Sequence, residues 1–144
     1  MRSMLILAAL AALVLAAPAS AKVKRLEANL SGSNEMPATD PAASGTAKVR
    51  LDRAKKKVCF TIRVRNVQDV VAAHIHKGGK SVASGPIVVT LLHGPEAGTK
   101  FTGCENNVPR AMIRAILRRP RRYYVNVHSM DFPGGEVRGQ LHKP

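Results

Sequence analysis

The sequence has no tryptophan, two tyrosines and three phenylalanines among its 144 residues. Proteins that bind single-stranded nucleic acid stack bases on aromatic rings, so this scarcity argues against a nucleic-acid partner. Acidic residues are also few, nine against 23 lysines and arginines, for a formal net charge of +14. The Ser-centred, Gly-rich phosphate-binding and C-x-x-C patterns of common enzymes are absent, and no pair of carboxylates stands out. The residue pattern therefore favours a non-enzymatic protein.

Beyond the N-terminal segment, no apolar run approaches the roughly 20 residues that a membrane-spanning helix needs. The N-terminal segment itself has an early cation, Arg2, an apolar run over 5–17 and small residues at 19–21. This order is typical of a secretory signal peptide cleaved after Ala21, with an uncleaved anchor as the alternative. We predict a signal peptide over 1–21, a secreted or periplasmic location outside the cytoplasm, and no membrane span after cleavage.

The chain has two cysteines, Cys59 and Cys104. Oxidising compartments outside the cytoplasm preserve disulfides, and two cysteines can pair in a single way. An exported protein is therefore expected to contain a Cys59–Cys104 disulfide. The alternative is a pair of buried free thiols.

Alternation of apolar and polar residues dominates the chain after the N-terminal segment, and Gly, Pro, Asn and Asp interrupt it often. Such a pattern predicts a series of short strands. The run at 87–92 is continuously apolar, as in a strand buried on both faces, and a Gly-rich stretch around 94–103 follows it. The expected strands are 26–30, 46–51, 58–64, 70–76, 87–92, 123–128 and 136–141.

Apolar residues at 112, 113, 116 and 117 have helical spacing and predict one short helix over 108–117, which Pro120 would stop. Many short strands with a single helix favour an all-β fold, an antiparallel Greek-key sandwich or barrel. We expect one domain over 26–142, preceded by a basic segment at 22–25.

The histidines offer the most specific chemistry. His74 and His76 are two positions apart on an expected strand, so they share a face at about 6–7 Å. His128 lies on a later strand, facing away from the apolar positions. If the two strands are adjacent, three neutral imidazoles form a Zn²⁺ or Cu²⁺ site with an open position for water or another ligand. The alternative is that the histidines bond to loops or are solvated; either way we expect an outer face shared with Glu136 and Arg138.

The densest basic cluster lies at the end of the expected helix and contains Arg114, Arg118, Arg119, Arg121 and Arg122. Cations at a helix C-terminus complement its dipole, so a solvated helix end is one interpretation. A polyanion-binding site is the other. Teichoic acids, acidic polysaccharides and anionic lipid headgroups are the polyanions available outside the cytoplasm. The expected partner is thus an anionic envelope polymer or another extracytoplasmic protein.

Several motifs together resemble the CHRD (chordin-type) domain family, in an order and spacing that extend from about residue 26 to 141. The resemblance implies an immunoglobulin-like or superoxide-dismutase-like β sandwich, usually exported, with no well-established activity. The motifs are Leu-Ser-Gly-Ser-Asn-Glu-Met-Pro at 30–37, Ala-Ser-Gly-Thr-Ala at 43–47, Ala-His-Ile-His-Lys-Gly at 73–78, Gly-Pro-Ile-Val-Val at 85–89, Tyr-Tyr-Val-Asn-Val-His at 123–128 and Phe-Pro-Gly-Gly-Glu-Val-Arg-Gly-Gln-Leu at 132–141.

A weaker likeness to copper/zinc superoxide dismutase concerns the histidines. In that family an H-x-H strand and a later strand histidine hold copper, and His74, His76 and His128 are similar in arrangement. This chain has no evident bridging histidine and no zinc-binding loop with its aspartate. The likeness thus implies one open mononuclear Cu or Zn site, and the alternative function is a metal-binding protein or a superoxide dismutase-like oxidoreductase.

Overall fold

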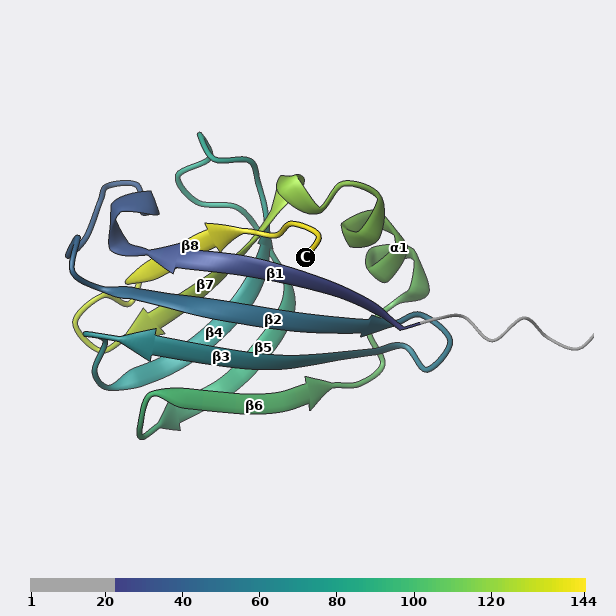
Figure 1. Ribbon diagram of the computed structural model, residues 1–144, viewed down its shortest axis with the longest axis horizontal. Coiled ribbons are helices and arrows are strands. Elements are labelled where there is room, and N and C mark those ends of the chain that lie inside the picture. The colour runs from purple at the N-terminus through teal and green to yellow at the C-terminus, as the bar shows by residue number, and fades with distance from the viewer. Residues whose placement is uncertain (1–22) are drawn as a thin grey trace, which may run out of the picture.

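The computed structural model describes residues 23–144, so the predicted signal peptide lies outside the described residues. Within them, eight strands form one antiparallel sheet in the order β5-β4-β7-β8-β1-β2-β3-β6 (Figure 1). The elements in chain order are β1 (Lys24–Ser31), η1 (Gly32–Asn34), β2 (Ser44–Asp52), β3 (Lys57–Arg65), β4 (Val70–Lys77), β5 (Ile87–Glu96), β6 (Lys100–Glu105), α1 (Arg110–Arg118), η2 (Pro120–Arg122), β7 (Tyr123–Ser129) and β8 (Val137–Gln140).

The sheet curls until its two edge strands approach each other. At this seam the Nε2 atom of His93 on β5 lies 3.1 Å from a carboxylate oxygen of Glu105 on β6. The result is a nearly closed barrel in which β3 and β4, and likewise β6 and β7, are consecutive but not adjacent. The predicted all-β antiparallel fold with one short helix is confirmed, in its barrel form. No helix in the described part of the chain is long and apolar enough to cross a bilayer.

Apolar and polar residues alternate along the strands, and the apolar side chains fill the barrel interior. Val49, Ile62, Ile75 and Val125 are fully buried, while their sequence neighbours turn away from the core. The helix α1 contributes Ile113 and Ile116 to the same core, and the two other predicted apolar positions pack against it. Burying an aliphatic side chain of this size contributes about 1.5–3 kcal/mol relative to leaving it exposed. Period-two patterning therefore explains most of the barrel interior.

The predicted disulfide is present. Cys59 on β3 lies directly opposite Cys104 on β6, and their sulfur atoms are bonded. The two residues are 45 positions apart, and a link that closes a loop of this length adds about 3–4 kcal/mol in the chain-entropy model. The bond thus fastens an edge strand to the rest of the barrel.

Three local predictions were wrong or shifted. The strand β6 falls largely in the stretch interpreted as Gly-rich loop, because Gly103 interrupts its alternation; a Cβ there would lie 2.9 Å from the ring of Phe60 opposite. The strand β5 is not buried on both faces, since Ile87 is 53% exposed. The helix begins two residues later than predicted, because Pro109 occupies its N-cap position.

Candidate functional site

The fold brings the three predicted histidines together. The strands β4 and β7 are antiparallel neighbours, with His128 directly opposite Ala72. A methyl group at Ala72 leaves room for the His128 ring to reach diagonally to His74, two residues further along β4. The ligand atoms of His74, His76 and His128 all lie within 4.8 Å of one another. The two strands are therefore adjacent, which is the condition that the predicted site requires.

The closest pair already has the spacing of metal ligands. The Nδ1 atom of His74 lies 3.1 Å from Nε2 of His128. Two nitrogens bound to Zn²⁺ at 2.0–2.1 Å with a tetrahedral angle are about 3.3 Å apart. Without a metal, the same distance allows Nδ1–H of His74 to donate a hydrogen bond to His128.

Backbone carbonyls orient the other two imidazoles. The Nδ1 atom of His76 is 2.8 Å from the carbonyl oxygen of Gly85, and that of His128 is 3.0 Å from the carbonyl oxygen of Pro133. A carbonyl only accepts, so both Nδ1 atoms carry the proton and both Nε2 atoms present a lone pair. Nε2 of His76 is buried and has no hydrogen-bond partner within residues 23–144. Proteins often orient metal-binding histidines in this way: one ring nitrogen donates to a backbone carbonyl, and the other faces the metal.

The outer face that carries these histidines is largely covered, which the sequence did not predict. His76 is 6% exposed and His128 8%, and Glu136 and Arg138 are also buried. The face does point away from the barrel core, as alternation predicts. Two loops, 78–86 and 130–136, cover it, and strand periodicity carries no information about what loops cover.

Burial keeps the imidazoles neutral. Desolvation, followed by the proximity of His128 and His76, lowers the pKa of His74 to about 4. Desolvation also lowers the pKa of His76 and of His128, against the opposing effect of their carbonyl hydrogen bonds. A metal binds the neutral imidazole, so the three side chains are in ligand form at neutral pH.

The first covering loop is held by Gly85 and Tyr124. The backbone N–H of Gly85 donates to the Tyr124 hydroxyl at 3.0 Å, while its carbonyl accepts from His76. A Cβ at Gly85 would collide with the carbonyl oxygen of Lys77. The Tyr124 ring also stacks on His76, with centroids 5.0 Å apart and planes 7° from parallel. One glycine thus connects the loop to both rings.

The second covering loop depends on Gly135. Its φ is +127°, and a Cβ there would collide with the side-chain amide of Asn126. The next residue, Glu136, donates its N–H to the carbonyl of Val127 at 2.8 Å, which returns the chain to the sheet. This close approach places the Pro133 carbonyl at the His128 ring.

Arg138 holds the first covering loop and η1 against β8, a role that the sequence did not predict. It is 2% exposed, and its Nε donates to the Asn34 carbonyl at 2.6 Å. Its terminal nitrogens donate to carbonyl oxygens in the first covering loop, those of Lys80, Val82 and Ala83. Its guanidinium also lies 4.9 Å from the Tyr124 ring centroid.

The sequence interpretation also missed Glu35. It is 7% exposed, and a carboxylate oxygen lies 3.8 Å from Nε of Arg138. Desolvation raises the pKa of Glu35 to about 7, although the positive charge of Arg138 opposes the shift. Glu35 and Tyr124 both lie in the motifs that carry the family resemblance, and this was the available signal that they matter.

The five predicted arginines are all exposed. They extend from α1 into η2 but do not share one pocket. Arg121 lines a groove beside β8 that also contains Arg138, whereas Arg114 lines a smaller one with Arg53 and Arg110. The cluster is therefore a surface and not a single cavity.

Searches of curated proteins and of solved structures found no match. A family model described as CHRD domain matches residues 26–141. Its span contains all eight strands except the first two residues of β1, and it contains the three histidines and both residues of the buried Glu35–Arg138 pair. The chain belongs to the CHRD domain family.

Proposed function

We propose that this protein binds a single copper or zinc ion through His74, His76 and His128. The observation that carries the proposal is a buried trio of imidazole ligand atoms within 4.8 Å of one another. The unpartnered Nε2 of His76 supports it, since a buried polar atom without a hydrogen bond costs about 1–3 kcal/mol unless something else satisfies it.

The donor set fits this group of metals. Imidazole suits both zinc and copper, and three protein ligands leave a position open for water or an exogenous ligand. His74 is less buried than the other two, so the open position has a route to solvent on its side. With copper, the same position would admit a small oxidant or reductant, which is the oxidoreductase version of the proposal.

The test is elemental analysis of protein purified without a chelator or an affinity tag, before and after reconstitution. We expect about one equivalent of copper or zinc per chain. The His128→Ala variant should lose it, whereas His93→Ala, which removes an exposed histidine outside the trio, should keep it. A reconstituted wild-type protein with less than about a tenth of an equivalent contradicts the proposal.

A second candidate function is a non-enzymatic module, outside the cytoplasm, that attaches to an anionic envelope polymer or an acidic protein partner. The supporting observation is the exposed arginine cluster, none of whose members forms an ion pair within residues 23–144. Such unpaired surface charge attracts polyanions with an affinity that falls as salt rises. The disulfide and the family are consistent with export, which N-terminal sequencing of the released protein would test.

Retention on an immobilised anionic polymer, measured against salt, tests this candidate. Replacement of Arg118, Arg119 and Arg122 by Gln should shift elution to clearly lower salt. Replacement of the exposed or half-exposed Lys55, Lys56 and Lys57 by Gln removes the same charge from a hairpin turn and is the matched control. If both triple variants shifted the elution salt equally, retention would depend only on net charge. That result would contradict a specific polyanion-binding surface at the arginine cluster.

A further inference from the structure

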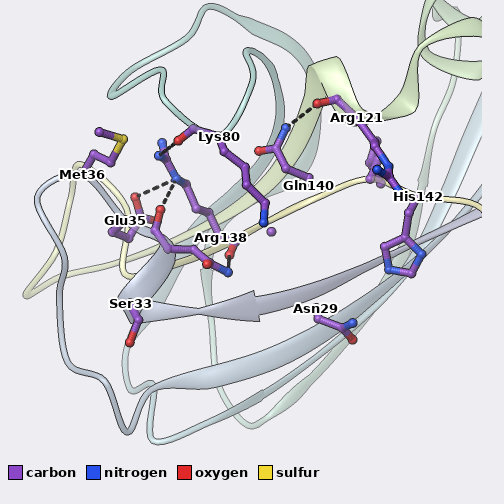
Figure 2. A pocket seen from close by; sticks show the side chains of 12 residues that line it. Asn29, Ser33, Glu35, Met36, Lys80, Arg121, Arg138, Gln140 and His142 are labelled. Carbon is purple, nitrogen blue, oxygen red and sulfur yellow. Dashed lines mark hydrogen bonds and ion pairs between the residues drawn. The ribbon is translucent and has the colours of Figure 1, made fainter.

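A groove of about 880 Å³ lies beside β8, on the side where β1 and the chain end pass. Its lining includes Glu35, Lys80, Arg121, Arg138 and Gln140, and none of the three histidines. Figure 2 shows Glu35, Lys80 and Arg138 toward one end and Arg121 with His142 toward the other. The groove is thus a separate cavity from the candidate metal centre.

One carboxylate oxygen of Glu35 in the groove is a buried hydrogen-bond acceptor that has no donor within residues 23–144. Glu35 is 7% exposed, and its Oε1 has no hydrogen-bond partner among the described residues. Arg138 does not satisfy this oxygen, because its Nε lies 3.8 Å from the other one and its guanidinium donates to four backbone carbonyls. A ligand group that donates a hydrogen bond, such as a hydroxyl, would satisfy this buried carboxyl oxygen.

The charge left in the groove is positive. Glu35 and Arg138 offset each other as a close pair. Lys80 and Arg121 are exposed, and neither forms an ion pair within residues 23–144. An ammonium and a guanidinium along the same groove favour an anionic ligand, to which each can donate a charge-assisted hydrogen bond.

The walls add neutral polar groups. Asn29, Ser33 and Asn34 are exposed along the groove, and its lining has no Phe, Tyr or Trp. Amides and hydroxyls bond to ligand hydroxyls, and the one ring in the lining, the imidazole of His142, lies toward the other end from Glu35. The combination selects a ligand that is polyhydroxylated, saturated and anionic.

We propose that this groove binds a sugar acid of the uronate class. The positive charge of Lys80 and Arg121 attracts the ligand carboxylate, and a ring hydroxyl donates to the Glu35 oxygen that has no partner within residues 23–144. None of the three histidines lines the site, and its ligand is a single acidic sugar unit and not a long polyanion lying on the arginine cluster.

The experiment is titration calorimetry of the full mature chain with glucuronate, glucose and cyclohexanecarboxylate. Glucuronate should bind at least about tenfold more tightly than either of the others, because each lacks one half of the recognition. Equal affinity for glucose would show that the cations contribute nothing, and equal affinity for cyclohexanecarboxylate would show simple ion exchange. Either result overturns the proposal.

Variants locate the binding. Replacing Lys80 and Arg121 by Gln should weaken glucuronate binding at least about tenfold and leave glucose unchanged. Both side chains are exposed, so the double variant is expected to fold. The Arg118, Arg119 and Arg122 triple variant should bind glucuronate like the wild type. Loss of binding in the triple variant, with retention in the double variant, would assign the anion to the helix end and overturn the groove site.

Discussion

The strand β7 is buried on both faces, and the adjoining part of β4 largely so, but the two faces are buried by different means. Toward the barrel, Ile75 and Val125 pack among aliphatic side chains that alternation alone places there. On the opposite face, His76, His128 and Asn126 are buried by loops that hydrogen bonds and two close-packed glycines hold in place. Apolar packing stabilises the first face, whereas the second keeps polar atoms away from water and oriented. We therefore expect metal binding on the histidine face, whose burial depends on particular hydrogen bonds and close glycine contacts.

The largest effect should come from breaking the clamp on the polar face. Arg138→Met removes the charge beside Glu35 and leaves four loop carbonyls without their donor. Breaking a buried pair in this way costs about 3–5 kcal/mol of the free energy of unfolding. Urea denaturation measures it, and Glu35→Gln in the same chain should restore part of the loss. A cost below about 1 kcal/mol would mean that the loops do not depend on Arg138.

The apolar face should respond to cavity formation alone. Ile75 is fully buried, so Ile75→Ala should lower the free energy of unfolding by about 3 kcal/mol. Because the side chain points away from the histidines, metal stoichiometry should not change in the folded variant. Loss of metal from a variant that remains folded would show that the two faces are not separable.

The pH dependence of stability should distinguish the contributions of Glu35 and His74. The pKa of Glu35 is raised from 4.5 to about 7 by burial, so the folded state holds its proton more tightly and Glu35 stabilises it at pH 5 relative to pH 7 by about 2 kcal/mol. The lowered pKa of His74, about 4 against 6.5, acts oppositely, since unfolding lets it take up a proton as pH falls below 6.5.

Glu35→Gln should therefore steepen the loss of thermal stability between pH 7 and pH 5. His74→Gln should flatten it. Melting temperatures across this range measure both slopes in the metal-free protein. Unchanged slopes in the two variants would contradict the assigned pKa shifts.

The smallest effect tests the loop that orients His76. Gly85→Ala forces the loop away from the Lys77 carbonyl and hence moves the carbonyl that holds the His76 ring. Disturbing such an outer contact lowers metal affinity about 10–100-fold, and we expect the lower end. Gly79→Ala is the matched control in the same loop, because nothing lies within 4 Å of a Cβ there. Equal affinities in a competition titration with a chelator would show that the Gly85 carbonyl does not position the ligand.

The sequence predicted the features that depend on period two. The alternation placed His74, His76 and His128 on one face, and a single possible pairing gave the disulfide. Burial of that face was not predictable, because it depends on where loops of Gly, Pro and Ser fold back. Glu35 meets Arg138 across 103 positions of sequence, and no local pattern encodes such a contact. The strand β6 was hidden by Gly103, whose function is to make room for Phe60.

The most direct test of the central claim, a preformed metal centre on the covered face, is X-ray absorption of the protein reconstituted with zinc. We expect three imidazole nitrogens at about 2.0–2.1 Å, with the remaining position taken by a light oxygen ligand. A shell with fewer than three imidazoles, or the same spectrum from the His128→Ala variant, would contradict it.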